Sequence, residues 1–544
     1  MAGTRPTAVL KRAGANLSRA ARRIAVRTAL PREGGVWVVV RLEPPLPDLS
    51  SPRLPFGPSP PMGLLDALAS LEAAATDPRV AGVVLRFRGV LQGWSHALSL
   101  RRAVLRLRES GKPVVAYGEM YGAESLLVAS AASRVWLPET GSVFLVGLRL
   151  EGFYLRGLLE KLDVRPEVVR VGSYKSAAEI LTRDDMSIEQ REQLEALADD
   201  LYGELVDALA QGRGLSPEAV RSRIDEGPYS ARAAVEAGLA DACLYPDEVE
   251  RELPVLASDT ATDPETGRPR LLPAARYHAL CVGDPGWRPL FRDVPRIAYV
   301  AARGAIHRGE GSRGIASDTL RELLDGIRRE DGVRGVVLRV ESPGGDAVAS
   351  DLLWRSVELL KQEKPVVVSM GDVVASGGYY MAAAADSLFA EAGTVTGSIG
   401  VVGGKVDLEG LYRRMGVAKD GVERGRRAGL LSEARGFTED ERAAMQALFD
   451  SVHESFVDRV ARGRGLPAER VEKLAQGRVW SGSRALGVGL VDALGGPLEA
   501  LREVCRRAGV AEGERYLLEL HPRRPTFPGW LSLLRFLPGR TGYW

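Results

Sequence analysis

The strongest constraint on the fold is an internal duplication. The segment RVAGVVLRFRGV at 79–90 resembles GVRGVVLRVESP at 332–343, at an offset of 253 residues. Farther along, residues 212–242 resemble residues 463–493 nearly position by position, at an offset of 251. An offset of 253 residues far exceeds the unit length of a solenoid repeat, so two homologous domains are predicted.

The duplication divides the chain into five predicted segments. A length of 544 residues agrees with this, because it exceeds what one hydrophobic core usually supports. Between the copies lies a stretch rich in Pro, Thr, Asp and Gly, which is typical of a linker. The segments are a basic leader at 1–30, an N-terminal domain at 31–255, a linker at 256–290, a C-terminal domain at 291–510 and a tail at 511–544.

Each copy alternates short β-branched runs with helical runs. The run KPVVVSM at 364–370 is apolar almost throughout, which suits a strand of a parallel sheet covered on both faces. The longer run at 439–463 indicates a helix. We therefore predict an α/β fold built on parallel strands.

Composition excludes several classes of function. The net charge is only +2, so bulk attraction to nucleic acid is not expected. Three widely spaced cysteines and five scattered histidines predict neither a disulfide framework nor a metal site. The phosphate-binding pattern GxxxxGK[ST] does not occur, so no nucleotide is expected. We predict that the chain uses no cofactor and no metal.

The two ends of the chain bear on its location. The leader carries six Lys and Arg residues between positions 11 and 27 without an acid, and no apolar run long enough to span a bilayer follows. It is either an amphipathic helix on an anionic membrane surface or a frayed leader. The C-terminal GWLSLLRFLPGRTGYW is either a peripheral attachment or a tail docked on the core. We expect a cytoplasmic or peripherally membrane-associated protein.

The C-terminal copy has a glycine turn that the N-terminal copy lacks. ESPGGDAVAS (341–350) follows a strand and opens a helix, where backbone N–H groups can bind negative charge. Gly344 and Gly345 correspond to Leu91 and Gln92 in the first copy. The fold therefore does not require these glycines, and an oxyanion hole for acyl transfer becomes the better interpretation.

A serine follows the next strand of the C-terminal copy. In VVASGGYY, Ser376 precedes Gly377, whose N–H can face the same reacting atom as the serine hydroxyl. The first copy has Ala123 at this position, so packing does not require a hydroxyl. Ser376 is the predicted nucleophile.

Such a serine needs a base. His307 and His453 lie in polar, charged contexts and are weaker candidates than Lys175 in GSYKSAAE. The C-terminal counterpart of Lys175 is Ala428, so each copy retains one member of a Ser–Lys dyad and has alanine at the other position. A lysine acts as a base only when neutral, which requires burial to lower its pKa from about 10.4.

These motifs resemble those of a known family. SPGG, ASGGYY, TGSIG and GSYKSAAE together are similar to the long, two-domain form of signal peptide peptidase A, within the Clp protease/crotonase-like superfamily. The resemblance covers roughly residues 36 to 510 and implies two tandem Clp/crotonase-like domains, each a spiral of repeated ββα units.

The resemblance also implies roles for individual residues. It implies Ser376 as nucleophile, Lys175 as general base and Ser398 as the residue that hydrogen-bonds the lysine amine. The implied oxyanion hole consists of Gly344, Gly345 and Gly377, with the amides of Gly345 and Gly377 as the donors to the oxyanion. The implied substrates are apolar peptides such as cleaved signal peptides, and the implied assembly is a homo-tetramer. Family members often carry an N-terminal membrane anchor, which we do not find here.

Two alternatives remain at this point. A crotonase-type acyl-CoA enzyme would share the paired-amide oxyanion site, but it would need an adenine-nucleotide pocket and acidic catalytic residues. A catalytically inactive, membrane-associated scaffold would have no use for the complementary Ser376 and Lys175. Covalent labelling of the serine would separate both alternatives from a peptidase.

Overall fold

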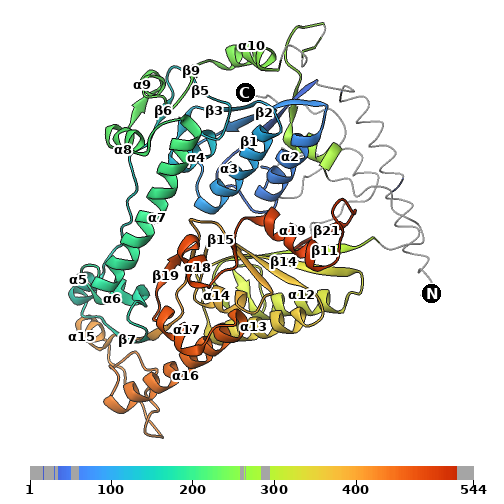
Figure 1. Ribbon diagram of the computed structural model, residues 1–544. Helices are drawn as coiled ribbons and strands as arrows, with labels where there is room; N and C mark the ends of the chain where they lie inside the picture. The colour runs from blue at the N-terminus through green and yellow to red at the C-terminus, as the bar shows by residue number, and fades with distance from the viewer. Residues whose placement is uncertain are drawn as a thin grey trace, which may run out of the picture.

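The computed structural model of the 544-residue chain shows two α/β halves stacked on each other (Figure 1). The halves have equivalent strand orders, and the predicted tandem duplication is confirmed. The structure describes residues 16, 30, 35–50, 61–257, 262–263, 265–282 and 294–522.

The N-terminal half is built on one parallel sheet. Its strands β1 (Val36–Leu42), β2 (Val80–Phe87) and β3 (Val114–Gly118) are apolar and almost entirely buried. The sheet has the order β10-β1-β2-β3-β5-β9, with short edge strands at β10 (Leu271–Pro273), β5 (Arg134–Leu137) and β9 (Ala242–Cys243). All of these neighbours pair in parallel, as the continuous apolar runs predict.

The sheet of the C-terminal half has the corresponding order. Its centre is formed by β11 (Arg296–Arg303), β14 (Val333–Ser342) and β15 (Val366–Ala375), which pair in parallel. Beyond β15 lie β17 (Val395–Gly397) and then β19 (Val479–Ser481), the latter antiparallel. The other strands of this sheet are β16 (Ser387–Ala390), β20 (Ala493–Leu494) and β21 (Leu517–His521).

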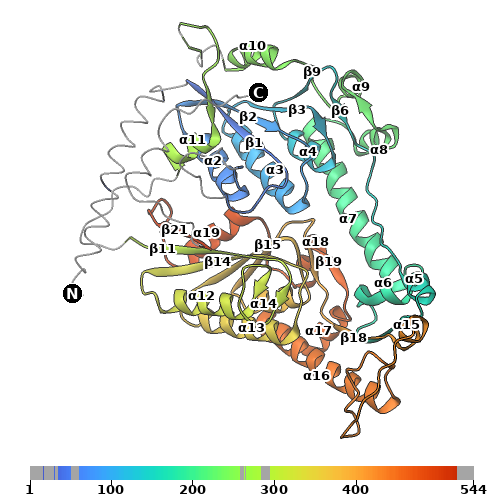
Figure 2. The same cartoon turned by 180° about the vertical axis from the view of Figure 1, so that it is seen from behind.

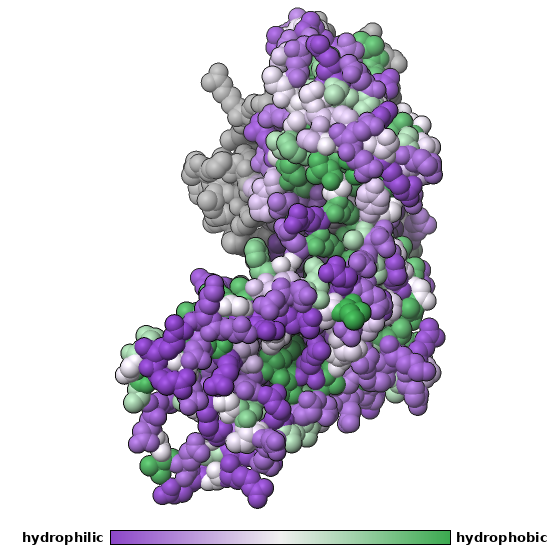
Figure 3. Space-filling model, turned by 90° about the vertical axis from the view of Figure 1, so that its left-hand side faces the viewer, coloured by the Kyte–Doolittle hydropathy of each residue, from purple (hydrophilic) through white to green (hydrophobic). Residues whose placement is uncertain are grey.

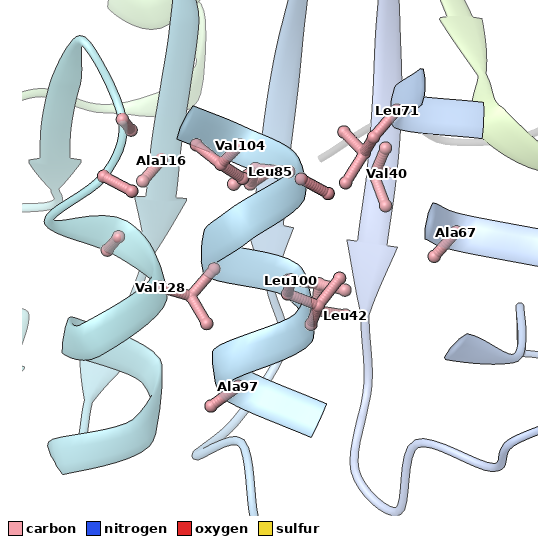
Figure 4. Packing of buried hydrophobic residues seen from close by; sticks show 14 of the residues in the cluster. Val40, Leu42, Ala67, Leu71, Leu85, Ala97, Leu100, Val104, Ala116 and Val128 are labelled. Carbon is pink, nitrogen blue, oxygen red and sulfur yellow. The ribbon is translucent and has the colours of Figure 1, made fainter. Parts of the chain in front are cut away.

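Helices lie on both faces of each sheet and join the halves through a shared core (Figures 1 and 2). In the first half, the face of the sheet that is directed towards the second half is covered by α2 (Leu64–Thr76), α3 (Trp94–Glu109) and α4 (Ala123–Ala129). Figure 4 shows Leu100 and Val104 of α3 among buried side chains of β1–β3. α10 (Pro246–Leu256) covers the outer face. Both α3 and α19 (Pro497–Arg507) contact β15 in the sheet of the second half. The opposite, outer face of that sheet is covered by α12 (Ser317–Arg329) and α13 (Ala347–Lys361).

Two arms extend from the stacked sheets and meet at their ends. Each contains a 26-residue helix, α7 (Ile188–Arg213) in the first half and α16 (Glu439–Arg464) in the second. The arms also carry α5 (Arg156–Lys161) and α15 (Glu409–Met415). Between the arms, β7 (Arg165–Val171) pairs antiparallel with β18 (Val401–Asp407). This ladder joins the lysine-bearing half to the serine-bearing half.

Two predicted boundaries differ from the structure. Residues 271–282, inside the predicted linker, form β10 and a helical segment whose Leu272 and Tyr277 are buried. Likewise β21, inside the predicted tail, pairs with β11 in the way that β10 pairs with β1. Both strands are too short for a recognisable alternation of apolar residues, but burial against an existing sheet edge stabilises them.

The predicted leader, apart from Asn16 and Leu30, lies outside the described residues, as does the predicted tail beyond Pro522. Within the part of the chain that the structure describes, no helix is both long and apolar enough to cross a bilayer.

Candidate active site

Ser376 lies between the carboxyl end of β15 and helix α14 (Gly377–Ala382). Its backbone has φ 53° and ψ −123°, a sparsely populated region for a residue with a side chain. The conformation is held because the N–H of Ser376 donates to the carbonyl of Gly397 at 2.8 Å. A strained turn that leaves the serine half-buried is typical of a functional position.

Ser398 lies beside Ser376 because the two residues follow neighbouring parallel strands. Ala375 at the end of β15 pairs with Gly397 at the end of β17. Ser398 also has a positive φ of 54°, and its N–H donates to the carbonyl of Arg478 at 2.7 Å. The sheet therefore brings two serines, 22 positions apart in sequence, to the same edge.

Lys175 reaches this edge from the other half. It follows β7, in a loop where the N–H of Tyr174 donates to the carbonyl of Gln476 at 2.7 Å. Two glycines allow the close approach. A Cβ on Gly172 would lie 2.5 Å from the carbonyl carbon of Gln476, and a Cβ on Gly477 would lie 2.5 Å from the Cβ of Lys175. Both glycines have positive φ, so a side chain would also strain the backbone.

The three predicted side chains meet within one chain. Lys175 Nζ lies 2.9 Å from Ser376 Oγ, 2.9 Å from Ser398 Oγ and 2.7 Å from the Ser398 carbonyl oxygen. Lys175 is only 5% exposed, and no carboxylate among the described residues lies close enough to shift the pKa of its amine. The amine is therefore fixed by hydrogen bonds alone, without an acidic partner to hold its proton.

Burial makes the amine of Lys175 easier to deprotonate. Desolvation lowers the pKa of its amine from 10.5 to about 8. At pH 7 a pKa of about 8 leaves roughly one amine in ten neutral, against roughly one in three thousand at 10.5. The pKa of Lys175 is therefore shifted in the direction that a lysine needs in order to act as a base.

The glycine turns lie against each other beside Ser376. Gly344 has φ 99°, and a Cβ there would lie 2.7 Å from both Gly377 N and Ser376 Cβ. A Cβ on Gly377 would lie 3.3 Å from Gly345 N. The N–H of Gly344 donates to Ser342 Oγ at 3.2 Å, whereas those of Gly345 and Gly377 have no hydrogen-bond partner among the described residues. These two amides remain available to a ligand.

The candidate histidines are engaged elsewhere. The ring nitrogens of His307 lie 3.0 Å and 2.7 Å from the carbonyl oxygens of Arg308 and Arg313. Buried His453 lies 3.0 Å from a carboxylate oxygen of Glu472. Neither ring makes a hydrogen bond to Ser376 in the described structure.

Sequence reasoning missed three residues that place the lysine: Gly172, Gly477 and Gln193. The glycines do not stand out among 61 in the chain. Gln193 had a detectable signal, because it continues the apolar stripe of Leu197, Leu201 and Leu205 at helical spacing, four residues apart. A polar residue in a buried stripe indicates a specific partner.

Comparison with known proteins agrees with this geometry. The chain is 35% identical over 467 residues to "Serine protease SPPA, chloroplastic" of Arabidopsis thaliana, covering 84% of this chain and 68% of that protein. It is 32% identical to "Protease 4" of Salmonella typhi, covering 85% and 74%, respectively. A shorter match, 34% identical, is to "Putative signal peptide peptidase SppA" of Enterococcus faecium, covering 33% and 52%.

The family assignment covers both halves. Residues 106–258 and 358–511 each match Peptidase family S49, so the predicted peptidase resemblance is confirmed, and neither the crotonase-type enzyme nor the inactive scaffold gains support. The second match contains Ser376 and the first contains Lys175. The chain is a member of Peptidase family S49 and a serine peptidase.

Proposed function

We propose that the chain is an endopeptidase that uses Ser376 as nucleophile and Lys175 as general base. The observation that carries this proposal is the 2.9 Å separation of Lys175 Nζ from Ser376 Oγ, with Nζ buried and free of acidic partners. Ser398 holds Nζ through its hydroxyl and its carbonyl. A nucleophile, a base and an orienting group are the parts that nucleophilic catalysis requires.

In the first step, neutral Lys175 takes the proton of Ser376 Oγ as the oxygen attacks the carbonyl carbon of the scissile peptide. Negative charge then develops on the carbonyl oxygen. The N–H groups of Gly345 and Gly377, rather than that of Gly344, are the proposed donors to this oxyanion, since the Gly344 N–H already bonds to Ser342.

The second step releases the products. The lysine ammonium donates its proton to the leaving amine, and the C–N bond breaks to leave an acyl ester on Ser376. The neutral amine then takes a proton from water as the water oxygen attacks the ester. The ammonium returns this proton to Ser376 Oγ as the C–O bond breaks, and the acid product leaves. Ser398 keeps Nζ within reach of Oγ in both steps.

The proposed substrates are apolar peptides, with cleaved signal peptides as the leading class. The printed name of the Enterococcus faecium relative supports this class. An apolar peptide would also displace water from the site and favour the neutral amine of Lys175. Hydrophobic side chains gather in patches on the face that includes the arms (Figure 3), which supports binding of apolar chains.

A fluorophosphonate probe tests the catalytic assignment. It should label the full-length protein covalently, and mass spectrometry should locate the adduct on Ser376. The Ser376→Ala protein, checked for an unchanged fold by circular dichroism, serves as the control and should not be labelled. Absence of label on the folded wild-type protein, or label at another serine, would refute the proposal.

We also propose that copies of this chain associate through their arms. Inside the chain, β18 pairs with β7. The offset of 253 maps β18 onto residues 148–154 and β7 onto residues 418–424, and neither of these described segments is a strand. Phe153 is 82% exposed and Val422 is 84% exposed. Pairing these segments between copies would repeat the internal ladder and bury both side chains.

Head-to-tail pairing forms a closed ring when the rotation between neighbouring copies closes, and the ring that we propose is the homo-tetramer implied by the family resemblance. Light scattering on a size-exclusion column should give a multiple of the 58.6 kDa chain mass. Phe153→Asp and Val422→Asp should each reduce the assembly, whereas Val255→Asp, at an exposed site on α10, should not. Monomers for the wild-type protein at micromolar concentration would contradict the pairing.

For location, we propose peripheral contact with an anionic membrane surface through the basic leader. Six positive charges without an acid between positions 11 and 27 support this contact. High salt or alkaline carbonate should release the protein from membranes, and retention in the membrane pellet after carbonate washing would contradict peripheral contact.

A further inference from the structure

A buried glutamine links the lysine loop to the serine-bearing half. Gln193 lies on the first turns of α7, the arm helix of the N-terminal half, and is only 3% exposed. A buried carboxamide costs free energy unless its donor and acceptor groups are satisfied. The partners of Gln193 therefore indicate what its side chain does.

The amide nitrogen of Gln193 binds both sides of the lysine. Its Nε2 donates to the carbonyl oxygen of Tyr174 at 3.3 Å and to Ser176 Oγ at 3.0 Å. These residues immediately precede and follow Lys175. The N–H of Lys175 donates to the carbonyl oxygen of Gly172 at 3.2 Å. The two bonds from Gln193 to the flanking residues further restrict the direction in which the lysine side chain leaves the loop.

The amide oxygen of Gln193 binds the other half of the protein. Its Oε1 accepts from the N–H of Val479 at 3.1 Å. Val479 in β19 pairs with Gly397 in β17, the residue directly before Ser398. The neighbouring carbonyl of Arg478 accepts from the N–H of Ser398 at 2.7 Å. One carboxamide therefore connects the backbone around Lys175 to the strand that fixes Ser398.

We propose that Gln193 is a positioning residue that sets Lys175 Nζ against Ser376 and Ser398 across the two halves. This inference rests on the proposed Ser–Lys function. It requires a side chain that donates on one side and accepts on the other, as only a carboxamide of this length does here. Leucine would fill the space without bonding, and glutamate would accept but not donate.

Loss of these bonds should affect the chemistry more than the fold. Displacing a catalytic group by about 1 Å costs on the order of 100-fold in rate. We expect Gln193→Leu to lower kcat/KM for an apolar peptide about 10- to 100-fold, through kcat rather than KM. Since Lys175 would lose its fixed position, the apparent pKa of the pH–rate profile should also shift.

Gln193→Glu keeps the size of the side chain and adds a negative charge near the lysine. The carboxylate favours the ammonium form, so the pH–rate profile should move to higher pH. The matched control is Gln446→Leu in α16, the long helix of the other arm, where Gln446 donates only to Asp450 among the described residues, at 2.9 Å. This control should leave kcat/KM and the pH profile unchanged.

The experiment uses the full-length protein throughout. Steady-state kinetics from pH 6 to 10, the rate of fluorophosphonate labelling and the melting temperature are measured for the wild type and the three variants. If Gln193→Leu does not fold, Gln193→Glu alone decides the question. A wild-type pH profile and labelling rate in a folded Gln193 variant would overturn the inference. Failure of the wild-type protein to be labelled at Ser376 would instead refute the Ser–Lys function itself.

Discussion

Each half has two neighbouring strand-to-helix turns at equivalent positions, but the residues in them differ. These turns are residues 343–345 and 375–377 in the C-terminal half and residues 90–92 and 122–124 in the N-terminal half. In the C-terminal half, Gly344 lies against Ser376, so the turn leaves room beside the hydroxyl. In the N-terminal half, Leu91 stands at the position of Gly344, and Val90 packs against Gly122, the residue before Ala123, where a Cβ would lie 2.5 Å from a methyl of Val90. The N–H of Leu91, which corresponds to Gly344, donates to Ser125 Oγ at 2.8 Å.

This difference separates the requirements of the fold from those of the chemistry. Both turns connect a buried parallel strand to a helix and bury their apolar residues, whether or not a serine is present. The amide of Leu91 and that of its counterpart Gly344 both donate to a serine hydroxyl, so this bond is common to the two halves. What differs is the side chains, since the N-terminal half has Leu91, Gln92 and Ala123 where the C-terminal half has Gly344, Gly345 and Ser376. Only the C-terminal half combines glycines at these positions with a serine hydroxyl, the combination that the proposed acyl transfer requires.

The largest expected effect comes from moving the serine between the halves. Ser376→Ala should abolish peptidase activity, a loss on the order of 10⁶-fold in kcat by analogy with other serine peptidases. Ala123→Ser in the same protein should restore none, because Leu91 and Gln92 replace the two glycines there and Lys175 contacts Ser376 in the other half. Peptide hydrolysis by the double variant, measured by chromatography, would contradict the proposal that only the C-terminal half can carry the nucleophile.

Removing the base should have the next largest effect. Lys175→Ala should lower kcat/KM by about 10²- to 10⁴-fold, and Lys175→Arg should do no better because guanidinium keeps its proton. Wild-type kcat/KM should rise with pH through an apparent pKa of about 8, since the active amine is neutral. A histidine-like profile that persists in Lys175→Ala would exclude the lysine as base.

Subunit mixing supplies the control for this prediction. Because Lys175 and Ser376 meet within one chain, mixing Ser376→Ala with Lys175→Ala protein should restore no activity. Activity regained after exchange of subunits would mean that the dyad forms between chains.

The smallest expected effect is on stability. Burial lowers the pKa of Lys175 from 10.5 to about 8, so below pH 8 the folded state carries an ammonium that burial disfavours. Lys175→Met removes this penalty and should raise the free energy of unfolding at pH 7 by roughly 1–3 kcal/mol, after lost hydrogen bonds are counted.

The stability gain has a defined pH dependence. It should be largest below pH 8 and should fade as pH rises from 8 towards 10.5, where the lysine is increasingly neutral in both states. Denaturant unfolding of both proteins at pH 7 and pH 10 measures this. An inactive variant that is less stable at pH 7, or a gain that is equal at both pH values, would contradict the burial argument.

Much of this arrangement was predictable because the chain contains its own comparison. The alanines at 123 and 428 marked Ser376 and Lys175 as dispensable to packing, and Leu91 did the same for Gly344. No local pattern could predict the ladder between β7 and β18, or the strands β10 and β21. These short strands are stabilised by partners distant in sequence, and Gln193 acquires its role only when the halves dock.

The division of the proposed dyad between the two halves has a consequence for synthesis of the protein. Lys175 and Ser376 are 201 residues apart, and Ser398 follows both. A ribosome therefore completes the lysine-bearing half long before the nucleophile is made, and domains fold as they emerge. The emerging chain holds no assembled dyad until the second half has folded onto the first. The proposed dyad can therefore assemble only after the second half has been synthesised.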